Sequence, residues 1–417
     1  MTQAQVETKG VEGKRFLGIT VLEAAKKRIA WLLDEFPRAC VAFSGGKDST
    51  VLLHLVAEAA REKGCRVGAV FLDWEAQFDR TIKHVETVLD MHADVVDPYW
   101  LAVPVMATNG CSVHQPEWEA WAPEEEYRWV RKRPSQAWEG KIPGLPRPVS
   151  FEDLVCHFAE FYAQGQPAVS IVGVRTQESL TRWRAVTTTG TKYGNRRWVN
   201  KITRPGPWKN ESLWSAYPIY DWKAQDVWAF HGKTGLPHNT IYDLMHQAGL
   251  TIHQMRIFQP YGTEQRRGLW LYHVLEPKTW GRVVARVSGI NSGALYGNDM
   301  GNITGNVKIT KPDRLTWSQF AELLLRTMPP ATGEHYRNKI AVFIKWHEDH
   351  GVPRNEIQDC FPGDTAQKGK PSWRRVCKVL LRNDYWCRGL SFSQTKPGRE
   401  KEYMALMKKR REKWGIW

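Results

Sequence analysis

The feature that most constrains the fold is the segment VAFSGGKDST at residues 41–50. An apolar run passes into a short polar, glycine-containing string, and a second apolar segment begins at Val51. This order predicts a buried strand, a tight turn and the start of a helix. Two adjacent glycines let the backbone approach a ligand closely, with the positive end of a helix dipole behind them. The residues of this candidate phosphate loop are Ser44, Gly45, Gly46, Lys47, Asp48 and Ser49.

The side chains of this loop also suit a phosphate group. Two serine hydroxyls can donate hydrogen bonds, and Lys47 adds a point charge. The Walker A pattern GxxxxGK[ST] cannot be laid over the segment. The string SGGKDS instead resembles the PP-loop of the ATP pyrophosphatases, which split ATP between the α and β phosphates. A turn that merely needs glycine accounts for the glycines but not for the whole string.

Strand-like and helix-like patterns alternate around the loop. A capping box at Thr20–Glu23 predicts a helix before it. Later segments predict, in order, a strand at Val67–Leu72, a helix at Asp79–Met91, a strand-like run from Ala93, a helix at Phe151–Tyr162 and a strand at Ala168–Val174. Such alternation predicts an α/β fold with a parallel sheet covered by helices, in which ligands bind at the carboxyl ends of strands.

The sequence predicts two domains. Residues 1–275 form a nucleotide-binding α/β domain with a Trp-rich insertion at about 109–149, and residues 276–417 form a mostly helical domain. The Gly- and Asn-rich stretch 289–306 reads as a loop. Helices are expected after a capping box at Thr316, and at Asn338–His347, Trp373–Leu381 and Arg399–Trp414.

A second motif follows the strand at Ala168–Val174. The spacing G-x-R-x-x-E-S-x-x-R, from Gly173 through Arg175 to Arg182, resembles the arginine motif of the PAPS reductase and ATP-sulfurylase small-subunit branch. Guanidinium groups bind phosphate or sulfate in a bidentate manner and stay charged when buried. An exposed helix start with salt bridges is the simpler alternative. Two further segments resemble the same branch: the P-I-x-x-W-x-x-x-D-V-W string at 218–228 and the L-P-x-N-x-x-Y turn at 236–242.

The resemblance spans roughly residues 20–250 and implies an adenine nucleotide alpha hydrolase-like (HUP-type) fold with ATP and Mg²⁺ as cofactors. It implies that Lys47 and the backbone at Gly45 and Gly46 hold the β and γ phosphates, with Ser44 and Ser49 assisting. Asp48, with Asp73 as the weaker candidate, is the expected Mg²⁺ ligand. Arg175 and Arg182 would hold the acceptor or the charge of the transition state, and Gly173 belongs to the nucleotide-binding set.

The chain also departs from the sulfonucleotide reductases. Its seven cysteines are scattered without a CxxC pair, so no iron–sulfur cluster or zinc is expected, and a reducing cytoplasm is the expected location. The segment after the L-P-x-N turn ends in His253-Gln254-Met255-Arg256, where reductases would carry cysteines. In this the chain resembles the uncharacterised PAPS reductase family proteins of bacteria and prophages that lie beside ParB-like genes. That resemblance implies a ParB-like protein partner.

The net charge of +15 suggests a polyanionic partner, nucleic acid first. The basic loop 191–210 is the candidate contact, because cations there alternate with Trp198 and Trp208 and no acidic residue interrupts them. A solvated basic surface is the equal alternative. The residues expected to meet nucleic acid are Arg196, Arg197, Trp198, Lys201 and Arg204.

Three functions are therefore considered. The first is an enzyme that cleaves ATP at the α-phosphate and transfers the adenylyl group to an unknown acceptor, such as sulfate or a nucleic-acid or protein group. The second is a nucleotide-dependent module that binds nucleic acid. The third, a sulfonucleotide reductase, is disfavoured by the cysteines. No apolar run approaches the length of a membrane span, so no membrane contact is expected.

Overall fold

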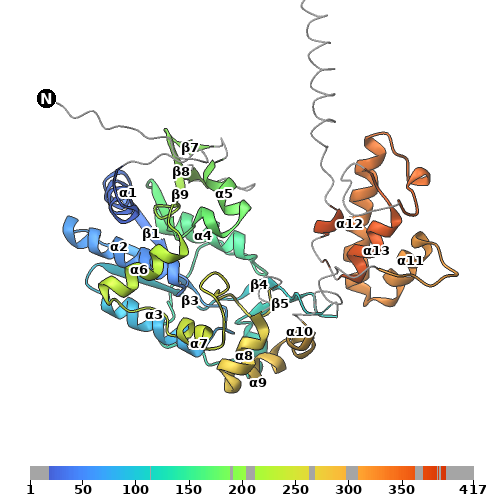
Figure 1. Ribbon diagram of the computed structural model, residues 1–417, viewed down its shortest axis with the longest axis horizontal. Helices are drawn as coiled ribbons and strands as arrows, with labels where there is room; N and C mark the ends of the chain where they lie inside the picture. Colours follow the sequence, from blue (N-terminus) through green and yellow to red (C-terminus); the bar gives the residue numbers. More distant parts are fainter. Residues whose placement is uncertain are drawn as a thin grey trace, which may run out of the picture. The chain divides into compact units, whose positions relative to one another are not determined.

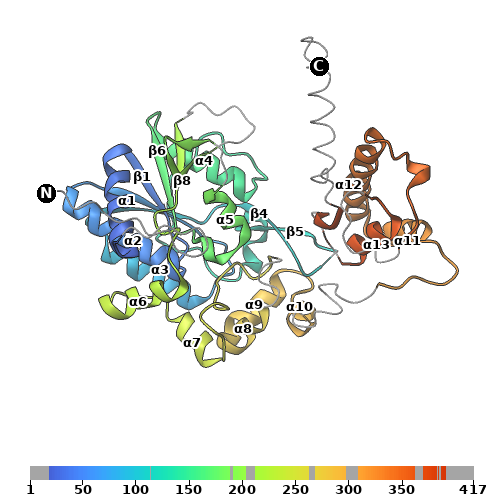
Figure 2. The same ribbon diagram turned by 45° about the horizontal axis from the view of Figure 1, so that its top comes forward.

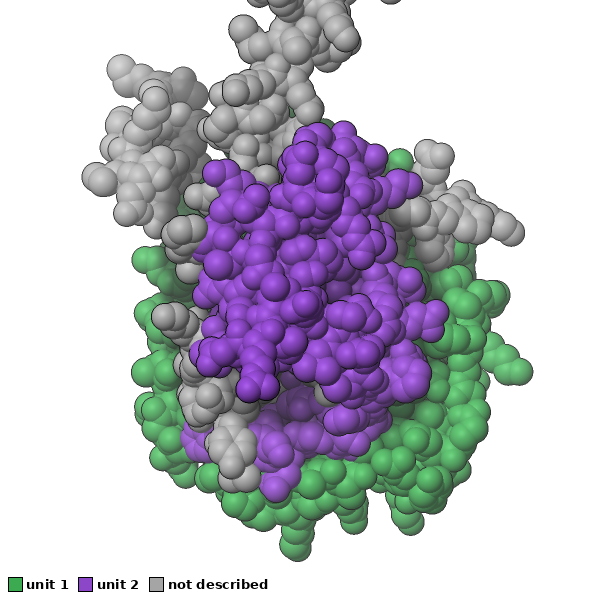
Figure 3. All heavy atoms as spheres, turned by 90° about the vertical axis from the view of Figure 1, so that its right-hand side faces the viewer, with its two compact units in different colours: residues 1–107, 119–260, 271–286 green, residues 108–118, 261–270, 287–417 purple. Residues whose placement is uncertain are grey.

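The computed structural model describes residues 18–112, 114–187, 191–202, 212–262, 268–296, 309–361, 370–382, 384 and 387–390. The chain divides into two compact units, which Figure 3 colours separately. Unit 1 comprises residues 1–107, 119–260 and 271–286, and unit 2 comprises residues 108–118, 261–270 and 287–417. Each unit is made of three segments that alternate along the chain. The predicted domain boundary between residues 275 and 276 stays a prediction.

Unit 1 is built on a mostly parallel sheet of seven strands in the order β3-β2-β1-β6-β9-β8-β7. The first five strands of this order run parallel to one another, and β8 and β7 run antiparallel at the edge. Helices lie on both sides of the sheet (Figures 1 and 2), which confirms the predicted α/β class. The strands are β1 (Arg38–Ala42), β2 (Val67–Leu72), β3 (Val96–Leu101), β6 (Ala168–Val172), β7 (Lys192–Tyr193), β8 (Arg196–Lys201) and β9 (Leu213–Ala216).

The helices of this part of the chain begin and end where local signals place them. The predicted capping box is present in α1, where Thr20 and Glu23 exchange hydrogen bonds, and α2 ends at Gly64 with a φ of 63°. Helix α2 packs on β1 and β2 beside α1 and α6, and α4 packs on β1, β6 and β9. The helices are α1 (Val21–Glu35), α2 (Lys47–Lys63), α3 (Asp79–Met91), α4 (Phe151–Ala163), α5 (Leu180–Thr187), α6 (Ala224–Thr234), α7 (Ile241–Gln247), α8 (Leu269–Leu275) and α9 (Pro277–Arg286).

The Trp-rich insertion is more regular than its sequence suggests. It contains β5 (Glu117–Ala120), which pairs with β4 (Val105–Thr108) in a two-stranded sheet, and a 3₁₀ helix at Pro123–Arg128. Trp118 and Trp121 are buried, so these side chains pack within the protein. The indole of Trp121 donates to the backbone carbonyl of Asp73 at 2.7 Å. Tryptophan therefore anchors irregular backbone here by combining apolar area with one polar contact.

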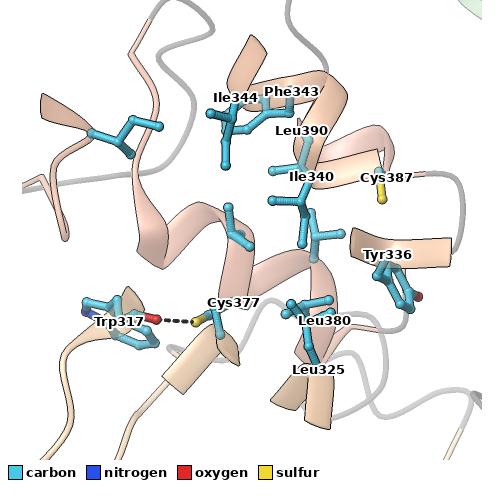
Figure 4. Packing of buried hydrophobic residues seen from close by; sticks show 14 residues of the cluster. Trp317, Leu325, Tyr336, Ile340, Phe343, Ile344, Cys377, Leu380, Cys387 and Leu390 are labelled. Atoms are coloured by element: carbon cyan, nitrogen blue, oxygen red, sulfur yellow. Dashed lines mark hydrogen bonds between the residues drawn. The ribbon is translucent and has the colours of Figure 1, made fainter. Parts of the chain in front are cut away.

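Unit 2 contains a helical module with its own core, shown in Figure 4. The module consists of α11 (Trp317–Thr327), α12 (Pro330–Asp349), α13 (Trp373–Leu381) and a 3₁₀ turn at Arg388–Leu390. The predicted capping box at Thr316 opens α11, and the thiol of Cys377 in α13 donates to the carbonyl of Trp317 at 3.1 Å. The predicted helix at Arg399–Trp414 lies outside the described residues.

Two stretches predicted as loops contain regular structure. Residues 290–296 form α10 (Ile290–Tyr296), because Ile290 and Gly293 lie one turn apart and are buried; a Cβ on Gly293 would lie 2.6 Å from the sulfur of Cys111. Residues 192–201 form the β7–β8 hairpin, in which Val199 is buried. Glycine in the first stretch and basic residues in the second led to the prediction of loops. Burial of their apolar side chains outweighs the low propensity of these residues for regular structure.

Candidate nucleotide site

The candidate phosphate loop connects β1 to α2, as predicted. Gly45 has a φ of 70°, and a Cβ there would lie 2.8 Å from Cγ2 of Val85, so this position requires glycine. The hydroxyl of Ser49 accepts the N–H of Ser44 at 3.2 Å and donates to the carbonyl of Gly46 at 3.1 Å. Helix α2 has no side-chain cap. Its first turn therefore presents N–H groups at the loop, which is the arrangement that binds anions at helix N-termini.

Lys47 is buried at the first position of α2, with 4% of its surface exposed. Its Nζ donates to the carbonyl of Met255 at 3.1 Å and lies 3.4 Å from a carboxylate oxygen of Asp48. Burial lowers the pKa of Lys47, Asp48 opposes that shift, and the nearby charges of Arg175 and Arg256 add to it. A phosphate beside this ammonium would restore its charge balance.

The arginine motif lies beside the loop because β1 and β6 are parallel neighbours, with Ala42 paired to Val172. A Cβ on Gly173 would lie 3.2 Å from the backbone of Asp48 and Ser49, so glycine permits the close approach of the two segments. The Nε of Arg175 donates to Asp48 at 2.5 Å, and this arginine is also buried. Two motifs whose paired residues are 127 positions apart in the sequence thus meet through an ion pair.

A second layer of charge surrounds this pair. Glu178 contacts Arg175 at 3.4 Å and forms an ion pair with Arg182. Burial lowers the pKa of Arg182, opposed by Asp48 and reinforced by Arg256 and Arg175. The guanidinium of Arg256 donates to the backbone carbonyl of Glu178 at 3.4 Å. Lys47 and three arginines therefore gather around two carboxylates, which leaves a local excess of positive charge suited to an anion.

Two residues that hydrogen-bond to the phosphate loop, Asn239 and Tyr242, were given no site role from the sequence. The buried amide of Asn239 donates to the carbonyl of Gly45 and to the hydroxyl of Thr81, both at 2.9 Å. The hydroxyl of Tyr242 accepts the N–H of Lys47 at 3.2 Å. Arg256 was noticed only as a departure from the reductases. The L-P-x-N-x-x-Y motif was the available signal, but spacing alone does not show which element it contacts.

Asp73 lies in a different environment from Asp48. Its carboxylate is fully buried, accepts the indole N–H of Trp100 at 2.7 Å and forms an ion pair with Arg131. It also accepts the backbone N–H of Glu75 at 2.9 Å. Asp73 is fully buried by these contacts, whereas the Asp48 side chain is 14% exposed beside the loop, so Asp48 is the better placed of the two proposed Mg²⁺ ligands.

The residues proposed for nucleic acid lie on the β7–β8 hairpin at the sheet edge. The guanidinium of Arg196 lies 3.8 Å from the ring centroid of Trp31, and Trp198 packs edge-on against the same ring. Arg197 is exposed, and Lys201 is the last residue of β8. Arg204 lies outside the described residues, as do Trp208 and Lys209. Trp198 is thus engaged in packing, and both Arg196 and Arg197 are exposed.

The seven cysteines are free thiols, and burial raises the pKa of Cys377 and of Cys387 to about 12. Such thiols are poor nucleophiles at neutral pH because the thiolate is the reactive form. Within the described ranges, no group of three or more His, Cys, Asp or Glu side chains is arranged to hold a metal ion. Among the helices described, none is long and apolar enough to cross a membrane.

Comparisons with known proteins agree with this geometry. Residues 38–248 match the phosphoadenosine phosphosulfate reductase domain, and residues 249–362 match a domain of unknown function, DUF3440. The uncharacterized protein YbdN of Escherichia coli K12 is 43% identical over 411 residues, covering 96% of this chain and 97% of YbdN. The chain therefore belongs to the phosphoadenosine phosphosulfate reductase domain family.

Solved structures with a detectable likeness include two nucleotide enzymes. A phosphoadenylyl-sulfate reductase from Candida auris is 15% identical, with a TM-score of 0.32 over 54% of this chain and 85% of that one. An NMN synthetase from Francisella tularensis is 13% identical, with a TM-score of 0.30 over 71% of this chain and 99% of that one.

Proposed function

We propose that this protein binds ATP on the loop Ser44–Ser49 and cleaves it at the α-phosphate, releasing pyrophosphate and transferring the adenylyl group to an acceptor. The observation that carries the proposal is the meeting of the phosphate loop with the arginine motif through the Arg175–Asp48 ion pair. The family model and the loop geometry support nucleotide binding; the cleavage position and the acceptor are the proposed part.

The residues present suit this reaction without covalent catalysis. In-line attack at the α-phosphate requires orientation of the acceptor and neutralisation of charge on the departing pyrophosphate. Lys47 and the N-terminal amides of α2 would bind the β and γ phosphates. Arg175, just after the adjacent strand β6, and Arg182, in α5, would bind the acceptor and the charge that develops on the α-phosphate.

A magnesium ion fits this site in the manner usual for nucleotide enzymes. Mg²⁺ is commonly held by one or two carboxylates together with substrate phosphates and water. Asp48 supplies one hard oxygen donor beside the loop, and because it already pairs with Lys47 and Arg175, the nucleotide phosphates would supply most of the negative charge for the ion. When bound, the ion would supply further neutralisation of phosphate charge.

Product analysis tests the proposal. The protein is incubated with ATP and Mg²⁺, alone and with sulfate, DNA or RNA, and pyrophosphate is measured separately from orthophosphate. We expect pyrophosphate, increased by the true acceptor. Orthophosphate as the product, or no turnover with any acceptor, would exclude adenylyl transfer to these groups.

Nucleic acid and a ParB-like protein are proposed partners. For nucleic acid the supporting observation is the exposed Arg197 on the basic hairpin. Charge reversal in Arg197→Glu should weaken DNA or RNA binding and reduce its salt dependence. The control is Lys132→Glu, a change of an exposed lysine in the Trp-rich insertion. Equal binding by both variants would remove the hairpin from consideration.

A further inference from the structure

Tyr242 has a buried hydroxyl with one hydrogen-bond role filled and one open. The side chain lies in α7 with 2% of its surface exposed, and its oxygen accepts the N–H of Lys47 at 3.2 Å. Within the described part of the chain, the structure gives its O–H proton no acceptor. A buried polar group normally has its hydrogen bonds satisfied, so this donor indicates a missing partner.

Another buried tyrosine, in helix α4, shows what a purely structural role looks like. The hydroxyl of Tyr162 accepts the N–H of Gly68 at 2.9 Å and donates to the carbonyl of Ala39 at 2.8 Å. Both of its roles are thus filled by backbone groups. The Tyr242 hydroxyl likewise accepts a backbone N–H, but it lacks the acceptor for its own proton that Tyr162 has within the described residues.

The open donor lies at the phosphate loop. A Cβ on Gly46 would be 3.4 Å from the Tyr242 hydroxyl, and Nζ of Lys47 lies 5.4 Å from the centre of the Tyr242 ring. Asp48 and Arg175 are close enough to act electrostatically on the phenol. The hydroxyl is therefore at the N-terminus of α2, beside the cations that the proposed function assigns to phosphate.

We infer that Tyr242 is a further nucleotide-binding residue, whose hydroxyl donates to a phosphate oxygen of the nucleotide held by the Ser44–Ser49 loop. The inference rests on the proposed function, because it takes the ligand of this loop to be a polyphosphate. Accepting the Lys47 amide polarises the O–H bond and strengthens its donation to an anion. Burial raises the pKa of the phenol, so it keeps its proton at physiological pH.

The Tyr242→Phe variant tests this role because it keeps the ring over Lys47 and removes only the hydroxyl. Calorimetric titration with ATP and with pyrophosphate should give a Kd that is raised about tenfold or more for both, the usual effect of losing a hydrogen bond to a charged group. The matched control is Tyr162→Phe, which should lower thermal stability and leave both affinities within about twofold of the parent. Circular dichroism and a thermal melt establish that each variant is folded.

If a folded Tyr242→Phe variant binds ATP and pyrophosphate as tightly as the parent, or more tightly, the inference is wrong. The hydroxyl would then serve only to accept the Lys47 N–H. The proposed function fails differently. If the parent protein binds neither ATP nor pyrophosphate, both ideas fall. If the parent binds ATP, Lys47→Ala abolishes binding and Tyr242→Phe does not, only the role of Tyr242 is wrong.

Discussion

At the residue scale, Lys47 supplies the ammonium proposed for phosphate binding, and burial has already removed this group from water. Replacing it by alanine, or replacing Ser49 by alanine, should weaken ATP binding. A charge-assisted phosphate contact contributes roughly 1.5–3 kcal/mol, or about ten- to a hundredfold in affinity. Titration with ATP measures the loss, with Lys63→Ala at the other end of α2 as the control. Parental affinity in both folded variants would contradict the loop assignment.

Arg175 makes a second prediction at the same scale. It follows β6, and its guanidinium contacts the loop at Asp48. Arg175→Ala should therefore reduce turnover or acceptor binding more than it reduces ATP affinity. Steady-state kinetics and ATP titration of the same preparation measure both effects. Losses of equal size would place this arginine on the nucleotide instead.

Much of the site could be predicted because its residues are concentrated in short motifs. SGGKDS carries the strand–turn–helix pattern, and the parallel pairing of β1 with β6 explains why Arg175 comes close to it. Asn239, Tyr242 and Arg256 could not be assigned in this way. Asn239 and Tyr242 contact the loop from 194 and 195 residues further along the chain, and Arg256 contacts Glu178 beside it. No local pattern encodes contacts of that range.

At the element scale, α9 is tied to the segment after β2 by a buried ion pair. Arg286 and Glu75 are both fully buried, with Nε of Arg286 2.8 Å from the carboxylate, and Glu75 also accepts the N–H of Trp121 and of Val130. Arg286→Ala would leave that carboxylate without its cation. It should destabilise the protein by about 3–5 kcal/mol.

Urea unfolding followed by tryptophan fluorescence measures this effect. The control is Lys278→Ala, an exposed lysine on the same helix, which should change stability by less than about 0.5 kcal/mol. An Arg286→Ala variant as stable as the control would mean that water reaches Glu75 and the pair is not buried in solution.

Four buried histidines in and around α2 predict how the stability of the protein depends on pH. Burial lowers the pKa of His54, His92 and His231 to about 4 and that of His84 to about 3. Unfolding returns each to about 6.5, so between these values the unfolded chain binds more protons than the folded one. The free energy of unfolding should therefore fall as pH is lowered from about 6.5 towards 4.

Urea midpoints measured at half-unit steps of pH test this dependence. The window from pH 6.5 to 5 is the informative one, because most carboxylates are still ionised there and the histidines dominate. Each unit of pKa depression is equivalent to about 1.4 kcal/mol. His84→Gln should flatten the profile. A midpoint that is constant or rises over this window would contradict the burial of these rings.

Elements with strong periodicity were predictable and those stabilised by tertiary contacts were not. Helix α3 and helix α13 have the predicted bounds, because apolar residues recur at helical spacing in both. The β7–β8 hairpin is short and basic. It packs on α1 at the sheet edge through ring contacts of Trp31 with Tyr193 and Trp198. Such contacts join residues far apart in the sequence, so a local sequence pattern cannot predict them.

At the scale of the whole molecule, the net charge of +15 and the cluster of cations at the loop point to anionic ligands of two sizes. The nucleotide is the small one, and nucleic acid remains the proposed large one. The helical module in unit 2 has a core of its own. The capping box at Thr316 and the helical segments after it predicted a helical C-terminal region, but they do not indicate its function.

The central claim is that ATP bound at the Ser44–Ser49 loop is cut between its α and β phosphates. The most direct measurement follows ATP carrying label at either the α or the γ phosphate, using the parent protein and Lys47→Ala. We expect the γ label in pyrophosphate and the α label in AMP or an adenylylated acceptor, with neither product formed by the variant. Release of the γ label as orthophosphate, or equal products from the variant, would contradict the account.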